Sequence, residues 1–293
     1  MSAPGPASGE TPPVALTVAG SDSGAGAGVQ ADLKAMSALG VFATTVITAV
    51  TAQNTAEVTA VHPVPIEVIE AQLAAVLDDF TVAAVKTGML GNAPVVRLVA
   101  GRAGAGELPN LVVDPVMVAS TGRRLLDDDA VDAYRTELLP LALLVTPNLF
   151  EASILAGVEP AGSADVDTMI DLARRIHDLG PSWVLVKGGH LPGVHLPEGD
   201  GTGRGAAPDR VTDVLFDGVD IHQLEASRVL TRNNHGTGCT TASATAALLA
   251  RGADVPEAVE GAKRFVHGAL VGSAGWALGR GHGPLDPFGW SAD

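Results

Sequence analysis

Short apolar runs alternate along this chain with segments of helical periodicity, and this alternation constrains the fold more than any other feature. Helices are expected at Val29–Leu39, Ile66–Phe80, Ala93–Ala100, Asp128–Leu138 and Asp165–Leu179. Strands are expected at Val14–Ala19, Val41–Thr51, Ala83–Lys86, Leu111–Val113, Leu141–Val145 and Trp183–Val186. Strands that alternate with helices in this order predict an α/β fold, in which a mostly parallel central sheet carries helices on both faces.

The C-terminal third departs from this alternation. Two β-prone runs, Val211–Phe216 and Val219–Leu224, flank the dipeptide Asp217-Gly218, which is typical of a hairpin turn. Two more helices are expected after the hairpin, at Thr240–Arg251 and Val255–Trp276.

Two segments fall outside the alternation of strands and helices, one at the N-terminus and one in the interior of the chain. Residues 1–13 are rich in Ser, Gly, Ala and Pro and predict a disordered tail. Residues 190–210, rich in Gly and Pro, predict a long loop. No boundary of a second domain is visible, so residues 14–293 are expected to form a single domain.

The chain is strongly acidic, with a formal net charge of −15 at pH 7 over 293 residues. This charge argues against nonspecific binding to nucleic acid and to anionic membrane surfaces. It does not exclude a phosphate ligand, because a few backbone N–H groups and one lysine make a local positive site. The sequence shows no signal peptide and no apolar run long enough to span a bilayer, and its single cysteine rules out an intrachain disulfide. We therefore expect a cytoplasmic enzyme.

Polar residues follow the expected strands at the points where those strands end. In a mostly parallel sheet these points lie along one edge, and ligands bind beyond that edge. The residues concerned are Asp22, Gln53, Lys86, Asp114, Asn148 and Lys187.

The single cysteine, Cys239, follows Gly236-Thr237-Gly238 and precedes a helix. A helix N-terminus offers unpaired N–H groups and a partial positive charge, which suit an anion. The same field is expected to lower the pKa of the thiol and to favour a thiolate. The alternative is a small buried apolar side chain, the commonest state of a lone cysteine. His235, just before this loop, is interpreted only as a loop residue.

Two segments are candidates for holding a substrate. The glycine-rich stretch Gly20–Gly28 lets backbone approach a ligand closely, although Val29 stands where a dinucleotide fingerprint needs its third glycine. Gln53 carries an amide that donates and accepts at once, which suits a pyrimidine edge, while a simple turn is the alternative.

Three further segments are candidates for handling a phosphate and a metal. Asp114 follows a strand and suits Mg²⁺, with an Asp-Pro turn as the alternative. Asn148 and Glu151 have the spacing of a capping box. Lys187, before two glycines, can reach a phosphate that is being transferred. The sequence has neither a zinc pattern nor a Walker pattern.

Seven ordered blocks give this chain a strong resemblance to a known family. The blocks are AGSDSGAGAGVQADLK, ITAVTAQNT, KTGML, DPVMVASTG, TPNLFEA, VLVKGGH and HGTGCT, in this order, and the resemblance runs from about Ala15 to Pro284. The chain resembles the bacterial hydroxymethylpyrimidine/phosphomethylpyrimidine kinases of thiamine biosynthesis, within the ribokinase-like superfamily. The resemblance implies a ribokinase-like three-layer sandwich that phosphorylates 4-amino-5-hydroxymethyl-2-methylpyrimidine and then its monophosphate. It implies ATP as cosubstrate, Mg²⁺ as cofactor and a homodimer.

The resemblance also implies roles for individual residues. Cys239 would be the catalytic base, Gly236, Thr237 and Gly238 the anion hole, and Lys187 a contact to the nucleotide phosphates. Nucleotide binding would also involve Asn148 and Thr237, and metal binding Asp114 and Glu151. The pyrimidine would be held by Gln53, Asp32, Ala27, Gly20, Met89 and Val116.

Two alternatives remain open on the sequence alone. One is a pyridoxal or pyridoxine kinase of the same fold. The other is a pyrimidine-binding regulator without catalysis.

Overall fold

The computed structural model of the protein describes residues 11–118, 128–159, 165–189 and 210–291. Of the expected tail, Thr11–Pro13 are described, and the Pro13 carbonyl accepts a hydrogen bond from Phe42 N at 2.9 Å. The expected loop 190–210 lies, except for its last residue, outside the described residues.

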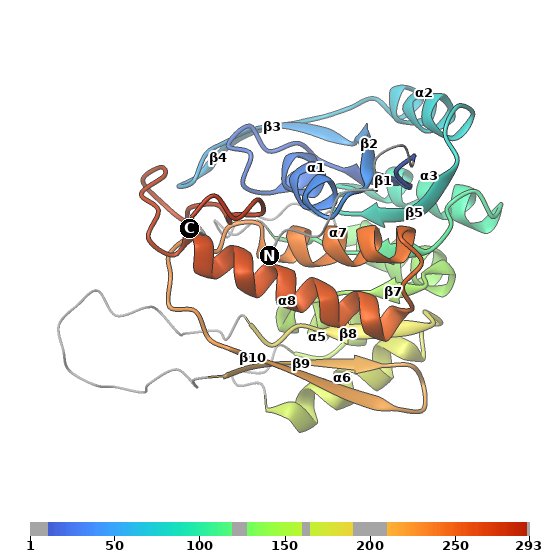
Figure 1. Cartoon of the computed structure of the whole chain (residues 1–293). Coiled ribbons are helices and arrows are strands. Elements are labelled where there is room, and N and C mark those ends of the chain that lie inside the picture. The colour runs from blue at the N-terminus through green and yellow to red at the C-terminus, as the bar shows by residue number, and fades with distance from the viewer. Residues whose placement is uncertain (1–10, 119–127, 160–164, 190–209, 292–293) are drawn as a thin grey trace.

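An eight-stranded sheet forms the centre of the molecule, in the order β10-β9-β8-β7-β6-β5-β1-β2 (Figure 1). The strands from β8 to β2 run parallel, and β9 and β10 add an antiparallel hairpin at one side. Their bounds are β1 Val14–Ala19, β2 Phe42–Ile47, β5 Val82–Thr87, β6 Leu111–Val113, β7 Leu144–Val145, β8 Trp183–Val186, β9 Arg210–Phe216 and β10 Ile221–Ser227.

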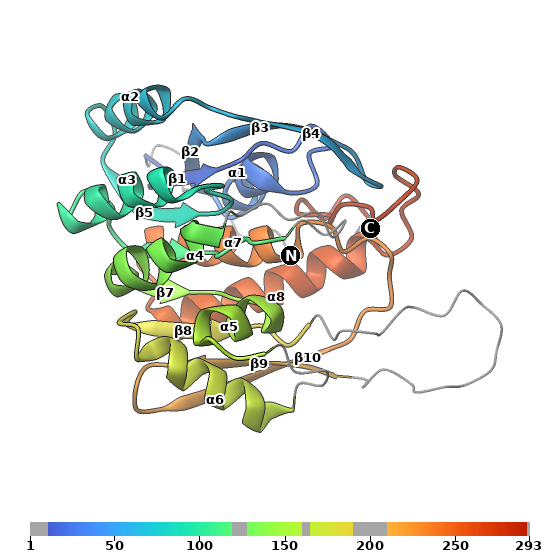
Figure 2. The same cartoon turned by 180° about the vertical axis from the view of Figure 1, so that it is seen from behind.

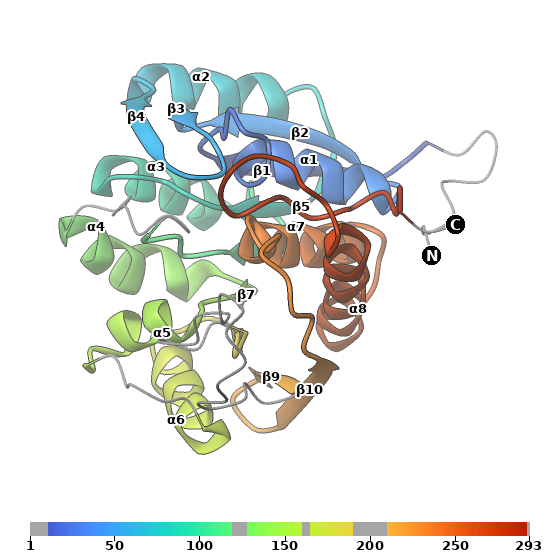
Figure 3. The same cartoon turned by 90° about the vertical axis from the view of Figure 1, so that its left-hand side faces the viewer.

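Helices cover both faces of this sheet, which makes three layers (Figures 2 and 3). One face carries α1 Gly28–Ala38, α7 Thr237–Ala250 and α8 Val255–Ser273. The other carries α2 Ile66–Leu77, α3 Ala93–Gly104, α4 Asp128–Ala133, α5 Leu149–Ala156 and α6 Val166–His177. Side chains alternate between two cores along the strands: Val112 and Leu185 pack with α7 and α8, whereas Val113 and Val186 pack with the other helices. The predicted mostly parallel α/β sandwich is confirmed.

One predicted strand is wrong. The run Val41–Thr51 is not a single strand, because the chain leaves the sheet at Thr48. The remainder forms β3 (Ala49–Gln53), which pairs antiparallel with β4 (Val58–Pro63) in a separate two-stranded sheet. In β3 buried and exposed residues alternate, and Val50 is 51% exposed, so this strand has one face in solvent. Apolar composition alone did not reveal the break.

The remaining elements differ from expectation mainly at their ends. The helix expected at Thr240 begins three residues earlier, so Cys239 lies in the first turn of α7. The segment Asp128–Leu138 is α-helical only to Ala133 and continues as a π-helical turn over Tyr134–Leu138. None of the helices in the described ranges combines the length and apolar character that crossing a membrane requires.

Helix α2 offers a test of the packing. Leu73 is fully buried between α2 and the sheet, so Leu73→Ala should lower the free energy of unfolding by about 2–5 kcal/mol. Val68 lies on the exposed side of the same helix, at 45% exposure. Val68→Ala should therefore change the free energy of unfolding by about 0.5 kcal/mol or less. Urea titrations followed by circular dichroism measure both, and equal losses would contradict this packing.

Candidate active site

A cavity of about 400 Å³ opens beyond the carboxyl ends of the parallel strands, between β3, β10, α7 and α8. It receives residues from every segment singled out in the sequence. The expected site residues that line it are Gly20, Ala27, Gln53, Met89, Asp114, Val116, Asn148, Glu151, Lys187, Gly236, Thr237, Gly238 and Cys239.

Asp32 is the exception, and its expected contact with a substrate is corrected. Its carboxylate is fully buried on α1 and does not line the cavity. It accepts from Thr17 Oγ1 at 2.6 Å and from Lys86 Nζ at 2.8 Å. Burial alone would lower the pKa of Lys86, but attraction by the carboxylates of Asp32 and Asp114 raises it. Asp32 therefore holds a charged Lys86 at the floor of the cavity.

The glycine-rich loop after β1 is organised by Asp22. This carboxylate accepts from the backbone N–H groups of Gly24, Gly26 and Ala27 at 2.8–3.0 Å. Burial would raise the pKa of Asp22, but hydrogen bonds from His235 and these N–H groups lower it below its usual value. A Cβ on Gly28, where φ is +59°, would lie 2.5 Å from the Gly20 carbonyl oxygen. The loop therefore closes tightly around an ionised carboxylate.

The anion loop before α7 packs directly on this glycine-rich loop. Gly236 has φ +83°, and a Cβ there would overlap the carbonyl of Gly26. Thr237 Oγ1 donates to Asn234 O at 2.6 Å and fixes the entry to the helix. The Thr237 N–H donates to Asn234 O at 3.3 Å. The first turn of a helix carries N–H groups without intrahelical partners, so Gly236, Gly238 and Cys239 are the candidate backbone donors to an anion.

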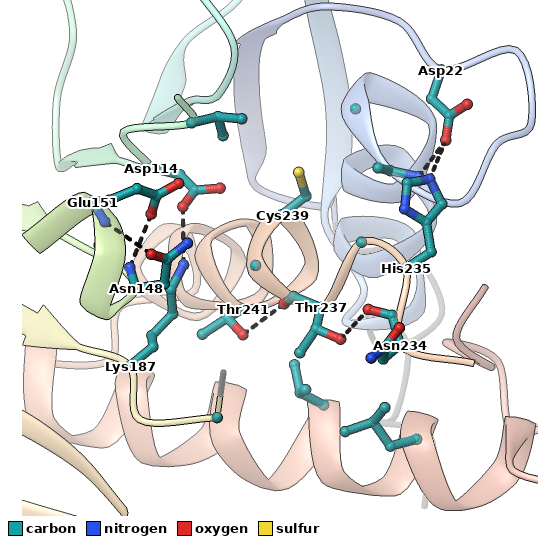
Figure 4. Close-up of a pocket in the computed structure, with 18 of the residues that line it drawn as sticks. Asp22, Asp114, Asn148, Glu151, Lys187, Asn234, His235, Thr237, Cys239 and Thr241 are labelled. Carbon is teal, nitrogen blue, oxygen red and sulfur yellow. Dashed lines mark hydrogen bonds and ion pairs between the residues drawn. The ribbon is translucent and has the colours of Figure 1, made fainter. Parts of the chain in front are cut away.

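Lys187 stands beside this turn. A Cβ on Gly238 would lie 3.3 Å from Lys187 Nζ, so the ammonium faces the start of α7. Lys187 Nζ also donates to Asp114 Oδ1 at 3.1 Å (Figure 4). The Lys187 ammonium therefore lies close both to the Asp114 carboxylate and to the backbone N–H groups at the start of α7.

The capping box predicted at Asn148 and Glu151 is confirmed. Asn148 Oδ1 accepts from Glu151 N at 3.0 Å, and Glu151 Oε2 accepts from Asn148 N at 2.9 Å. Burial raises the pKa of Glu151 to about 7, Lys187 opposes this rise and Asp114 adds to it. Glu151 and Asp114 therefore share one lysine as their cation.

The carboxylates of Asp114 and Glu151 are the candidate ligands for Mg²⁺ in this site. The described residues contain no group of three or more His, Cys, Asp or Glu side chains arranged for a metal. Mg²⁺ commonly takes one or two protein carboxylates and completes its shell with water and substrate phosphates. Asp114 and Glu151 thus suit a Mg²⁺ that arrives with a nucleotide.

The expected thiolate at Cys239 is wrong for the protein without ligands. Burial raises the pKa of the thiol to about 11; Lys86 lowers it, and the carboxylates of Asp32 and Asp114 raise it further. The Gly28 N–H donates to the sulfur but does not offset burial. Figure 4 shows Cys239 between Asp114 and Lys187 on one side and the pair of Asp22 and His235 on the other. The residue occupies the centre of the site as a thiol.

Sequence reasoning missed the roles of Lys86 and His235. Lys86 was noted only as a strand-end residue, and nothing local to it indicates the partner on α1. His235 was interpreted as a loop residue, yet its Nε2 lies 2.9 Å from Asp22 Oδ2. The partner of each residue is an acid in the block AGSDSGAGAGVQADLK. Asp32 lies 54 residues from Lys86, and Asp22 lies 213 residues from His235. The presence of these two acids was the available sequence signal.

Comparison with known proteins identifies the family. A sequence model described as phosphomethylpyrimidine kinase matches residues 22–286. The chain belongs to this family. It is 48% identical to a hydroxymethylpyrimidine/phosphomethylpyrimidine kinase of Rhizobium meliloti, over 94% of this chain and 97% of that protein. It is 47% identical to one of Streptomyces coelicolor, over 99% of each.

The phosphomethylpyrimidine kinase family shares its fold with other kinases. A Bacillus subtilis pyridoxal kinase, solved as an ADP complex, matches this chain with a TM-score of 0.83 and 37% identity, covering 97% of this chain and 100% of that one. The predicted ribokinase-like fold is thereby confirmed. The family assignment also makes the chain a phosphotransferase.

The state of Cys239 is testable by alkylation. The thiolate is the reactive form, and well below the pKa its fraction rises about tenfold per pH unit. With the pKa raised to about 11, the rate with iodoacetamide should keep rising through about pH 9, whereas a thiol of ordinary pKa, about 8.5, levels off near there. Mass spectrometry of the ligand-free protein measures the rate, and Cys239→Ala gives the unlabelled control. A plateau below about pH 9 would contradict the raised pKa.

Proposed function

We propose that this protein transfers the γ-phosphoryl group of ATP to the hydroxymethyl oxygen of 4-amino-5-hydroxymethyl-2-methylpyrimidine, and then phosphorylates the monophosphate to the diphosphate. The observation that carries the proposal is the arrangement around Cys239. Asp114, Glu151, Asn148 and Lys187 lie on one side of the sulfur, where phosphate and metal would bind, and the pair of Asp22 and His235 lies on the other, beside which the ring would bind (Figure 4).

The pyrimidine ring would occupy the part of the cavity that carries small and apolar residues. Gly20, Ala27, Met89 and Val116 line it, and a Cβ on Gly20 would overlap the Met89 methyl group. Gln53 supplies an amide at the same place. Such a pocket suits a flat ring with one polar edge.

The phosphoryl half supplies positive charge and donors. Lys187, Gly236, Thr237 and Gly238 would neutralise and orient the transferring group, which needs positioning more than covalent chemistry. Asn148 and Thr237 would contact the nucleotide. Asp114 and Glu151 would hold Mg²⁺, which supplies charge neutralisation of the phosphates when it is bound.

Cys239 would take the proton of the hydroxymethyl group as the new O–P bond forms. Its sulfur must be ionised for this step, and the buried Lys86 ammonium, which lowers the thiol pKa, favours that form. The resting thiol therefore limits the reactive fraction of the enzyme at neutral pH. The cytoplasm and a homodimer remain the predicted compartment and assembly.

A substrate comparison tests the proposal. A coupled assay of ADP release with the pyrimidine, its monophosphate and pyridoxal should give the highest kcat/KM for the pyrimidine, with turnover of the monophosphate. Cys239→Ala should lower kcat about 10²–10⁴-fold with little change in the KM for ATP, because it removes only the proton acceptor. A higher kcat/KM for pyridoxal would reject the substrate, and absence of pyrimidine-dependent ATP consumption would favour the regulator.

The raised pKa of Glu151 predicts a pH dependence of metal use. Below about pH 7 the carboxyl is protonated, so a proton competes with Mg²⁺. The Mg²⁺ concentration for half-maximal rate should therefore rise as pH falls from about 8 to 6. Nucleotide phosphates titrate in the same range, so the readout is the difference between wild type and Glu151→Gln.

The exposed Glu137, which pairs with Arg97, provides the matched control. Glu137→Gln should follow wild type at each pH, and Glu151→Gln should lose part of the pH dependence. The same pH dependence in wild type and Glu151→Gln would show that Glu151 does not bind the metal.

A further inference from the structure

One ring nitrogen of His235 faces two partners. Its Nε2 lies 2.9 Å from Asp22 Oδ2 and 3.2 Å from the side-chain Nε2 of Gln53. The imidazole is 5% exposed, so water does not easily replace either partner. The contacts with Asp22 and with Gln53 therefore both depend on whether Nε2 carries a proton.

The two contacts make opposite demands on that nitrogen. A hydrogen bond to the carboxylate requires a proton on Nε2, because an ionised carboxylate only accepts. A hydrogen bond from the Gln53 amide nitrogen requires Nε2 to be bare. Both cannot be satisfied at once.

The ionisation state of Asp22 determines whether His235 Nε2 carries the proton. Besides His235, Asp22 accepts from three backbone N–H groups, and these bonds hold its pKa below the usual value. Asp22 therefore stays ionised, and Nε2 carries the proton. The group that Gln53 turns toward His235 must then be the amide oxygen, which exchanges the positions of the amide oxygen and nitrogen.

The rest of Gln53 is held in place by the glycine-rich loop. Gln53 N donates to Ser23 Oγ at 2.8 Å, and Ser23 Oγ donates to Gln53 O at 2.6 Å. The backbone is thus tied, and His235 sets which end of the amide reaches the cavity.

We propose that His235, held by Asp22, is a positioning residue that fixes the Gln53 amide with its oxygen toward the imidazole and its NH₂ toward the substrate. The NH₂ then donates to an acceptor nitrogen of the ring, so the site selects rings with an acceptor at that edge. This inference rests on the proposed pyrimidine kinase function.

A structural role of His235 is the competing explanation. His235 N donates to Gly283 O at 3.0 Å, and the ring packs on Gly26. If the residue only supported the anion loop, its loss would impair ATP use and turnover. If it orients Gln53, its loss raises the KM for the pyrimidine alone.

Two replacements separate these roles. The amide nitrogen of His235→Gln reproduces the position of Nε2 and has two hydrogens, one for Asp22 and one for the Gln53 oxygen. This variant should keep the pyrimidine KM within about twofold of wild type. His235→Asn is too short, and it should raise that KM about three- to tenfold, the range of one lost hydrogen bond. The KM for ATP should stay within about twofold in both.

The exposed His62 on β4 provides the matched control, and His62→Asn should leave both KM values unchanged. KM does not depend on the concentration of active enzyme, so the comparison survives partial unfolding of a variant. Parallel loss of kcat and of ATP affinity in His235→Asn, with the pyrimidine KM unchanged, would overturn the inference.

A double-mutant cycle completes the test. In a Gln53→Ala background, His235→Asn should change the pyrimidine KM by less than about twofold, because the group it orients is gone. Equal fold-changes in both backgrounds would show that His235 does not act through Gln53. A wild-type protein that never phosphorylates the pyrimidine would instead reject the proposed function, and this inference with it.

Discussion

Two loops from opposite ends of the chain meet with no room for a side chain between them, and the site depends on this contact. Gly236 of the anion loop lies against Gly26 and Ala27 of the glycine-rich loop. One loop follows the first strand and borders the ring pocket, while the other begins α7 and offers donors to the phosphate. In the proposed function, their contact would fix the distance between the substrate hydroxyl and the group it receives. A Cβ at Gly236 would push the two loops apart, in addition to straining a backbone with positive φ.

The charges at the floor of the cavity explain how a chain with a net charge of −15 accommodates a triphosphate. Lys86 pairs with Asp32 and Lys187 with Asp114, so two largely buried ammonium groups lie beside the proposed phosphate site. The balance has a consequence for Cys239. Its pKa is raised by burial and by Asp32 and Asp114, and neutralising Asp114 would remove one of those charges. In the proposed site, Mg²⁺ held by Asp114 would therefore remove one of the contributions that raise the thiol pKa.

The sequence predicted the parts of the site that depend on local signals. Strand ends, the capping box of Asn148 and Glu151, and the glycine-rich turn before α7 all follow from neighbouring residues, and the fold then brings them together. The features that the sequence did not predict depend on contacts between residues far apart in the chain. The thiol of Cys239 was expected to be ionised because a helix N-terminus was visible, whereas the burial that outweighs this effect was not. The family resemblance implied a substrate contact for Asp32, and its actual partner Lys86, 54 residues away, could not be identified from spacing. The β3–β4 pair was missed because an apolar run does not show where a strand leaves its sheet.

That missed β3–β4 unit bears on specificity. The residues proposed to handle the phosphoryl group lie at the ends of the parallel strands and at the start of α7. Gln53, at the end of β3, belongs to the part that leaves the sheet, and its partners lie on the two loops. The residue proposed to contact the ring is thus separate from the residues proposed for the transfer chemistry, and one link between them is His235, the residue directly before Gly236. A change of ring preference can therefore arise on β3 and β4 without altering the phosphate site, whereas a change at His235 affects which donor or acceptor the substrate meets.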